Sequence, residues 1–255
     1  MPEYVARVLP GTRVRRVATR KKAGGKPHPK AKTKTKAKAK RERSAVEKIA
    51  RAAGWMAGAM EGLEVMLTPT RDLFDSIHAR RSHKRFKDKP VDADHVRVLL
   101  DAAVTAPNHK MTEPWGFLVL GPNLRRTYAE RKAQLKFGEL IATDGNAKAD
   151  QMITDLLGVP VVIGVTQKVD ADPVRREEDY AAVFMAIQNM LLAGTALGLG
   201  TKVQTGNILD DEPFRAALGL TEGERLVAVL HVGEPSEEMP AKKRTPSADK
   251  TRWLD

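Results

Sequence analysis

The first 53 residues limit where this chain can build a hydrophobic core. They contain 18 Lys and Arg against three acidic residues, a formal charge of +15, whereas the whole chain carries +12, so the remaining residues carry −3. The stretch GGKPHPKAKTKTKAKAK alternates Lys with Ala or Thr around prolines. Such a composition buries too little apolar surface to offset the entropy of the chain. We therefore expect residues 1–43 to form a disordered basic tail.

A helix-capping pattern marks the end of this tail. Ser44 followed by Glu47 is typical of a capping box, in which each side chain satisfies a backbone N–H at the start of a helix. Apolar residues then recur at helical spacing as far as Leu67, shortly before Pro69. We expect a helix over 45–66, within an amphipathic helix or linker over 44–67.

Helix and strand patterns alternate over residues 68–235, which predicts an α+β domain followed by a polar arm over 236–255. The expected helices are a short one over 72–79 that buries Leu73, Phe74 and Ile77, one capped by Asp92 and ended by Pro107, a polar one opened by Asn123, a long central one over 176–199, and one with Pro213 at its first position. The expected strands are 115–120, 159–165, 201–205 and 227–232.

Several kinds of chemistry find no support in the sequence. The chain has no cysteine, which excludes disulfides, thiolate metal sites and cysteine nucleophiles. It has neither HExxH nor GxSxG, so we expect no metal site and no hydrolytic triad. No apolar run reaches the length of a membrane span, and we expect a cytoplasmic protein. The glycines of ALGLGTK (196–202) close a helix and precede a strand, which indicates a helix cap instead of a dinucleotide loop.

The stretch HARRSHKRFKDKP (78–90) concentrates three Arg, three Lys and two His in thirteen positions. One interpretation is a basic surface loop. The other is an anion site, in which Arg80, Arg81 and Ser82 hold a phosphate at the junction of two elements. The residues of this stretch alone leave both open.

The surrounding motifs resemble a known family. RRS (80–82), RF (85–86) and KPV (89–91), followed by APNHKMTEPWGFLVL (106–120), resemble the opening of the FMN-dependent nitroreductase family. The second motif is similar to the APDHK motif of its small NAD(P)H nitroreductase subgroup. NMLLAGTALGLGTKVQTG and LVAVLHVGEP resemble later segments of that family in the same order.

The resemblance implies a homodimer with a central, mostly antiparallel sheet flanked by helices, and with FMN held between the subunits. It implies that Arg80, Arg81 and Ser82 bind the flavin phosphate and ribityl chain, and that Lys84 or Arg85 lies near the isoalloxazine ring, where a cation raises the flavin potential. Further positions that match flavin contacts are Thr105, His109, Val203, Gln204 and Thr205. Thr105 departs from an arginine of the subgroup, and the triplet 203–205 lacks the arginine of a WRS-like motif. Ala193, Gly194, Thr195, Ala196, Leu197 and Gly198 match a segment assigned to the nicotinamide nucleotide.

The activity that this resemblance implies is oxidoreduction. NADH or NADPH passes a hydride to flavin N5, and the reduced flavin then reduces a nitroaromatic, a quinone or a similar small-molecule acceptor by ping-pong kinetics, with no catalytic side chain required. The alternative is a nucleic-acid-binding protein that acts through the basic tail by nonspecific contact with phosphates, with a body that is inactive or repurposed. Bound flavin in the purified protein would support the oxidoreductase over the nucleic-acid-binding protein.

Overall fold

The computed structural model describes residues 71–138 and 147–254. The expected tail (1–43) and the helix or linker (44–67) lie outside the described residues, so their boundaries stay predictions. None of the described helices is both long and apolar enough to cross a membrane.

The described domain is built on one four-stranded antiparallel sheet. Its strands are β1 (Trp115–Val119), β2 (Val161–Lys168), β3 (Gly200–Gln204) and β4 (Glu224–Gly233), and their order across the sheet is β1-β2-β4-β3. All four expected strands are present, and the predicted α+β class with an antiparallel sheet is confirmed.

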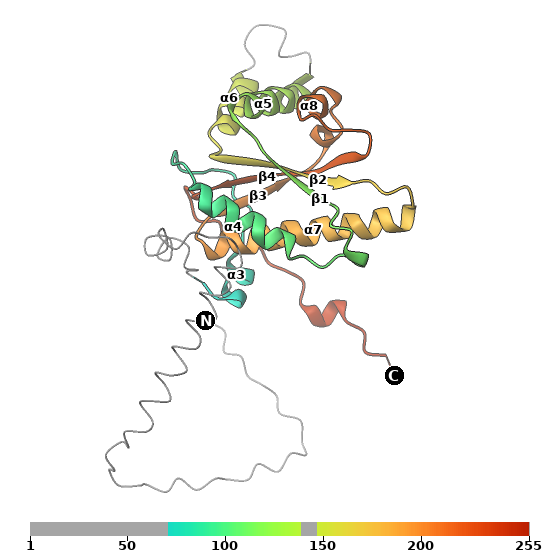
Figure 1. Cartoon of the computed structure of the whole chain (residues 1–255). Helices are drawn as coiled ribbons and strands as arrows, with labels where there is room; N and C mark the ends of the chain where they lie inside the picture. The colour runs from blue at the N-terminus through green and yellow to red at the C-terminus, as the bar shows by residue number, and fades with distance from the viewer. Residues whose placement is uncertain (1–70, 139–146, 255) are drawn as a thin grey trace, which may run out of the picture. The chain divides into compact units, whose positions relative to one another are not determined.

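Helices cover both faces of the sheet (Figure 1). One face carries α4 (Ala93–Val104) and α7 (Pro173–Ala196), and the other carries α5 (Pro122–Phe137), α6 (Ala147–Leu157) and α8 (Glu212–Ala217). Because successive side chains of a strand point to opposite faces, the core consists of two clusters, one on each face of the sheet. In β2, for example, Ile163 and Val165 pack with α7, whereas Val162 packs with the opposite helices.

A β-bulge between β2 and β4 adjusts this alternation. Val165 pairs with Ala228 and Thr166 with Leu226, so Val227 has no partner in β2. Val227 and Ala228 both join the core beneath α4 and α7. Beyond the bulge the residues of β4 keep alternating, which leaves His231 on the face that α5 covers.

Aspartate caps set where the helices begin. The side chain of Asp92 accepts the N–H of Asp94, and that of Asp172 accepts the N–H of Val174. With Pro173 as its first residue, α7 begins three residues before the expected start and ends at Ala196 instead of 199. Asp211 caps α8 so that Pro213 is its second residue instead of its first. Helix α6 was not expected from the sequence.

The short helix α3 (Leu73–Ala79) forms where expected but does not bury its apolar side chains. Leu73, Phe74 and Ile77 are 62%, 71% and 45% exposed, and Ser76 is its buried residue. The expectation of burial was therefore wrong for the single chain. The physical reason is that α3 contacts α7 by one side, so its apolar side faces outward.

Candidate functional site

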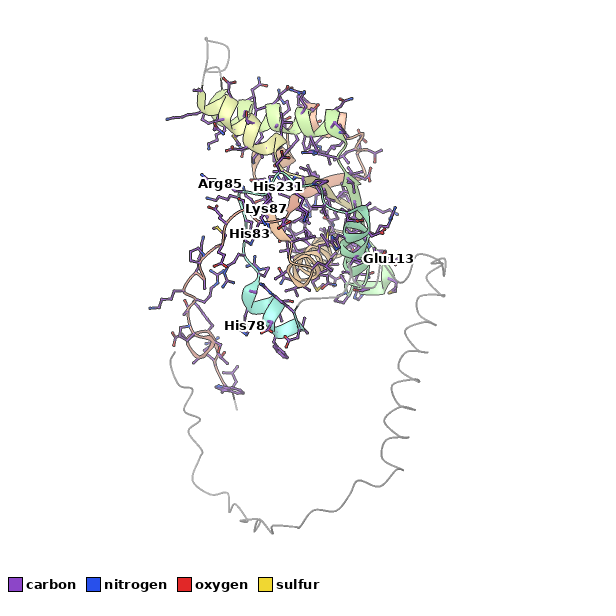
Figure 2. The ribbon with its side chains drawn as sticks, turned by 90° about the vertical axis from the view of Figure 1, so that its left-hand side faces the viewer. His78, His83, Arg85, Lys87, Glu113 and His231 are labelled. Carbon is purple, nitrogen blue, oxygen red and sulfur yellow. The ribbon has the colours of Figure 1, made fainter. Side chains whose placement is uncertain are left out.

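The basic stretch predicted as an anion site is extended and runs beside β3, at the edge of the sheet. We call residues 80–86 the edge segment. Ser82 forms a parallel bridge with Thr201, and the His83 N–H donates to the Thr201 carbonyl at 2.9 Å. Extended backbone sends successive side chains to opposite sides. Accordingly Lys84 lines one cavity, whereas Arg81 and His83 line another. Figure 2 shows His83, Arg85 and Lys87 together on one side of the molecule, away from Glu113.

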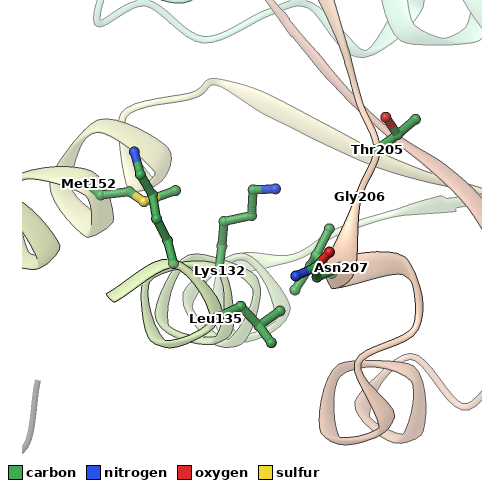
Figure 3. Close-up of a pocket in the computed structure, with 8 residues that line it drawn as sticks. Lys132, Leu135, Met152, Thr205, Gly206 and Asn207 are labelled. Atoms are coloured by element: carbon green, nitrogen blue, oxygen red, sulfur yellow. The ribbon is translucent and has the colours of Figure 1, made fainter. Parts of the chain in front are cut away.

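The larger of these cavities, about 930 Å³, lies between the β3 edge and helices α5 and α6. Five lysines line it, so we call it the lysine cavity: Lys84, Lys132, Lys136, Lys148 and Lys202. Gln151, Asp155, Gln204 and His231 are its other polar residues. A smaller cavity of about 350 Å³ shares Lys132 and Lys136 and extends to Thr205, Gly206 and Asn207. In Figure 3 Lys132 rises from α5 into the space between Met152 and these three residues.

The lysine cavity is strongly cationic. Burial and the nearby ammonium groups of Lys84 and Lys136 lower the pKa of Lys202. Burial, Lys202 and Lys136 likewise lower the pKa of Lys132. Within the described residues no ion pair involves Lys84, Lys132, Lys136 or Lys202, whereas Lys87 and Lys89 both pair with Glu234. Uncompensated charge of one sign in a partly closed site favours a ligand of the opposite sign.

A neutral histidine lies at the inner wall of the cavity. His231 is buried in β4 and its Nε2 lies 2.9 Å from the hydroxyl oxygen of Tyr128 on α5. Burial, followed by Lys202 and Lys132, lowers the pKa of His231 to about 3. The imidazole is therefore uncharged at neutral pH and adds no further positive charge to the lysines.

The structure divides the predicted flavin-contacting residues among several places. Lys84 and Gln204 line the lysine cavity, and Thr205 lines the adjoining one. Val203 instead packs against the core beneath α7. Arg85 is exposed, and its guanidinium lies 3.9 Å from the Glu237 carboxylate. Of the two candidates for the ring cation, Lys84 lines this cavity and Arg85 does not.

Arg81 lies on the opposite side of the edge segment. Its Nη1 donates to the carbonyl oxygens of His78 at 2.6 Å and Arg80 at 2.9 Å. With Thr195 and Gly198 it lines a separate cavity of about 350 Å³. These contacts hold the turn after α3, in which Arg80 is the C-cap residue. Alternation along the extended backbone that follows puts Ser82 on the same side as Lys84.

The segment matched to the nicotinamide nucleotide, 193–198, forms the end of α7. A Cβ on Gly194 would lie 3.0 Å from Cγ2 of Thr201, so this glycine allows α7 to approach β3 closely. The hydroxyl of Thr195 donates to the Leu191 carbonyl. Gly198 has a φ of 75°, which suits a glycine after a helix end. None of the six residues lines the lysine cavity.

Thr105 and His109 also lie outside the lysine cavity. The Thr105 hydroxyl donates to the Ala102 carbonyl at the end of α4, and His109 is exposed at the start of η1 (His109–Met111).

The loop that carries His109 is strained. Lys110, Met111 and Glu113 have φ values of 52°, 54° and 43°, in the left-handed region that non-glycine residues rarely adopt. Asn108 Oδ1 accepts the N–H of Glu113 at 3.0 Å, and the Thr112 hydroxyl donates to Asp179 at 2.6 Å. Strain that is held in place by such bonds gathers at functional sites.

Sequence reasoning missed most of the cavity wall: Lys132, Lys136, Lys148, Gln151, Lys202 and His231. Two signals pointed to some of them. Lys202 and Gln204 share one face of β3, and Lys132 and Lys136 are one turn apart on a polar helix. Among the described residues no cluster of His, Asp or Glu could hold a metal ion.

Comparison with known proteins gives consistent matches. The family model described as "Nitroreductase family" matches residues 77–234. "Putative NAD(P)H nitroreductase YfhC" of Bacillus subtilis is 34% identical over 184 residues, which cover 70% of this chain and 92% of that protein.

Solved structures share the fold. A nitroreductase-like family protein from Bacillus cereus has a TM-score of 0.62 at 29% identity, covering 74% of this chain and 98% of that one. A structure from Desulfovibrio desulfuricans, described as a putative nitroreductase in complex with FMN, has a TM-score of 0.57 at 24% identity and covers 72% and 98%. The residues matched by the family model include the edge segment, the sheet and helices α5 and α6.

Proposed function

This chain belongs to the nitroreductase family of oxidoreductases, and we propose that it is an FMN-dependent NAD(P)H oxidoreductase that reduces nitroaromatics, quinones or similar acceptors. The observation that carries the proposal is the lysine cavity at the β3 edge. The names of similar proteins supply the other support, since they include NAD(P)H nitroreductase and a complex with FMN.

The residues of the lysine cavity fit an anionic flavin nucleotide. A pocket of several hundred Å³ with a few polar groups is the usual setting for a cofactor. Lys84 and Lys202 supply cationic donors from the edge segment and β3, and Gln204 supplies an amide. When bound, FMN would supply the hydride-transfer chemistry. The lysines would then favour its reduced, anionic form over the oxidised form, because a nearby cation stabilises added negative charge.

The proposal assigns the phosphate end to the edge segment. Ser82 follows the same alternation as Lys84, Arg80 precedes it at the end of α3, and an arginine binds a phosphate through two parallel hydrogen bonds. Arg81 contributes by holding the turn that precedes them. His109 and Thr105 fit this scheme as contacts to the flavin of a second subunit, since neither lines the cavity of its own chain.

We propose a homodimer that covers the apolar side of α3. Leu73, Phe74 and Ile77 are exposed to water in the described part of a single chain, and an apolar surface of this kind is typical of an interface. Phe74→Asp should give a monomer in analytical ultracentrifugation, and His78→Asp on the same helix is the matched control. A Phe74→Asp protein that stays dimeric places the interface elsewhere.

The test of the function is direct. The purified protein should be yellow, release FMN on denaturation, and oxidise NADH or NADPH when a quinone or a nitroaromatic is added. A colourless protein that takes up no FMN from solution would contradict the proposal. The alternative function, nucleic-acid binding through the basic tail, would then be tested by measuring the affinity of the full-length chain for duplex DNA.

A further inference from the structure

Two lysines on α5 face the lysine cavity from the side opposite the sheet. Lys132 and Lys136 are four residues apart on one face of the helix, and both line the large and the small cavity. Like charges at this spacing destabilise a helix. Burial adds to the cost at Lys132, whose pKa is lowered. Lys136 Nζ lies 5.2 Å from the centre of the Phe137 ring. No ion pair of either lysine is found within the described residues, so an anion bound between the walls would stabilise this arrangement.

The flavin alone does not account for this charge. Four lysines of the lysine cavity, Lys84, Lys132, Lys136 and Lys202, have no ion pair within the described residues. The carboxylate that lines the cavity, Asp155, accepts a hydrogen bond at Oδ1 from the Gln151 amide at 2.8 Å. A phosphate monoester carries about −1.5 to −2 at neutral pH. Arg80 is not among the residues that line the cavity, so its charge is additional. It belongs to the edge segment, which is the proposed site of the flavin phosphate. Positive charge therefore remains on the α5 wall after the cofactor has been counted.

We propose that Lys132 and Lys136 bind an anionic group, a phosphate or a carboxylate, on the substrate that enters the cavity after the flavin. The inference rests on the proposed function, because it assumes that FMN lies against the sheet wall formed by Lys84, Lys202 and Gln204. Two substrates carry such an anionic group: the nicotinamide nucleotide, through its phosphates, and an electron acceptor that has a carboxylate. A lysine suits either one, since its ammonium acts as a mobile point charge without a fixed geometry.

The experiment uses the FMN-loaded full-length chain and the double variant Lys132→Gln/Lys136→Gln. Arg126→Gln is the matched control, because Arg126 is on the same helix, is exposed, pairs with Glu130 at 3.8 Å and lines neither cavity. Flavin content, the flavin spectrum and the urea midpoint of each protein show whether cofactor and fold are retained.

Two series of substrates then distinguish the sources. The reductants are NADPH, NADH and the uncharged benzyl-dihydronicotinamide, and the acceptors are nitrobenzoate and the uncharged nitrobenzene. We expect KM for at least one charged series to rise about 10- to 100-fold in the double variant, the range for losing a hydrogen bond to a charged group. KM for the uncharged member should stay within about twofold, and Arg126→Gln should match the wild type. The series that responds identifies the source.

Three results would overturn the inference. Unchanged KM for every charged substrate would show that the lysines bind none of them. An equal loss for charged and uncharged substrates would show a structural effect. Loss of FMN from the folded double variant would assign the lysines to the cofactor. A wild-type protein without flavin is a different outcome, since it refutes the proposed function itself before any variant is compared.

Discussion

The imidazole of His231 and the hydroxyl group of Tyr128 form a buried hydrogen bond, 2.9 Å long, between β4 and α5. Both side chains are almost inaccessible to water, and the Tyr128 ring also packs against Phe214 of α8. The bond therefore joins the sheet to the helix that carries the α5 lysines, next to the cavity.

The stability of the domain should fall below about pH 6.5 because of His231. The pKa of its imidazole is about 3 in the folded protein, against 6.5 for an ordinary histidine in the unfolded chain, so below pH 6.5 the unfolded chain binds one more proton. The stabilising contribution is complete above pH 6.5 and declines by about 1.4 kcal/mol per pH unit as the pH falls toward the folded pKa. Urea unfolding of the wild type and of His231→Phe at pH 7, 6 and 5 measures how the free energy of unfolding depends on pH. His78→Phe is the control, because His78 is exposed. A wild type and variant with parallel pH profiles would contradict this prediction.

Asp211 should be among the most destabilising positions to truncate. Its carboxylate accepts two hydrogen bonds from Arg131, at 2.9 and 2.7 Å, and caps α8 through the Phe214 N–H at 3.0 Å. Asp211→Ala removes the helix cap and the ion pair of Arg131, which keeps its hydrogen bond to Gln134, at a cost of about 2–4 kcal/mol. Asp211→Asn keeps a capping oxygen and should cost less. The midpoints of urea unfolding rank the two, and equal midpoints would show that the cap contributes nothing.

Lys84 and Arg85 should differ in their effect on the flavin. Lys84 lines the lysine cavity, whereas Arg85 lies near Glu237 at the surface. Lys84→Gln should weaken FMN binding about 10- to 100-fold, equivalent to roughly 1.5–3 kcal/mol. It should also lower the midpoint potential of the bound flavin, because a stabilising cation is lost. Arg85→Gln should change neither quantity. Titration of the apoprotein and potentiometry measure both, and a larger effect from Arg85 would reverse the assignment.

Steady-state kinetics should be ping-pong. If the reductant and the acceptor use the same space beside the α5 wall, the oxidised nicotinamide must leave before the acceptor enters. Double-reciprocal plots at several fixed concentrations of a quinone should then be parallel. Intersecting lines would require a ternary complex and hence separate sites for the two substrates.

The basic tail should be dispensable for flavin chemistry. Residues 1–53, which include the tail and carry a charge of +15, precede the residues that the family model matches, which begin at residue 77. A chain that begins at Met66 should stay yellow and active, and the full-length chain should bind duplex DNA without sequence preference. The slope of log K against log[salt] should be about −0.9 for each phosphate neutralised. A shortened chain that loses FMN would place residues 44–65 in the folded domain, and a full-length chain that does not bind DNA at low salt would leave the tail without this role.

Local sequence patterns determined the four strands and most of the helices with their approximate bounds, whereas helix α6 was not recognised. Pairs such as Asp92 with its following apolar face, or Asp172 with Pro173, specify a helix start through contacts only a few residues apart. The apolar strands 161–168 and 224–233 could likewise be recognised, because a buried strand requires continuous apolar residues. The motifs around 80–82 and 106–120 were sufficient to identify the family.

The tertiary structure alone decided which charges meet. Lys84, Lys132 and Lys202 are far apart in the chain and come from an edge segment, a helix and a strand, so no local pattern places them in one cavity. The same holds for the separation of Lys84 from Arg85 and for the outward face of α3, which a helical pattern alone would bury. Helix and strand signals depend on neighbours within a few residues, whereas electrostatic repulsion, burial and exposure depend on which segments the folded backbone brings together.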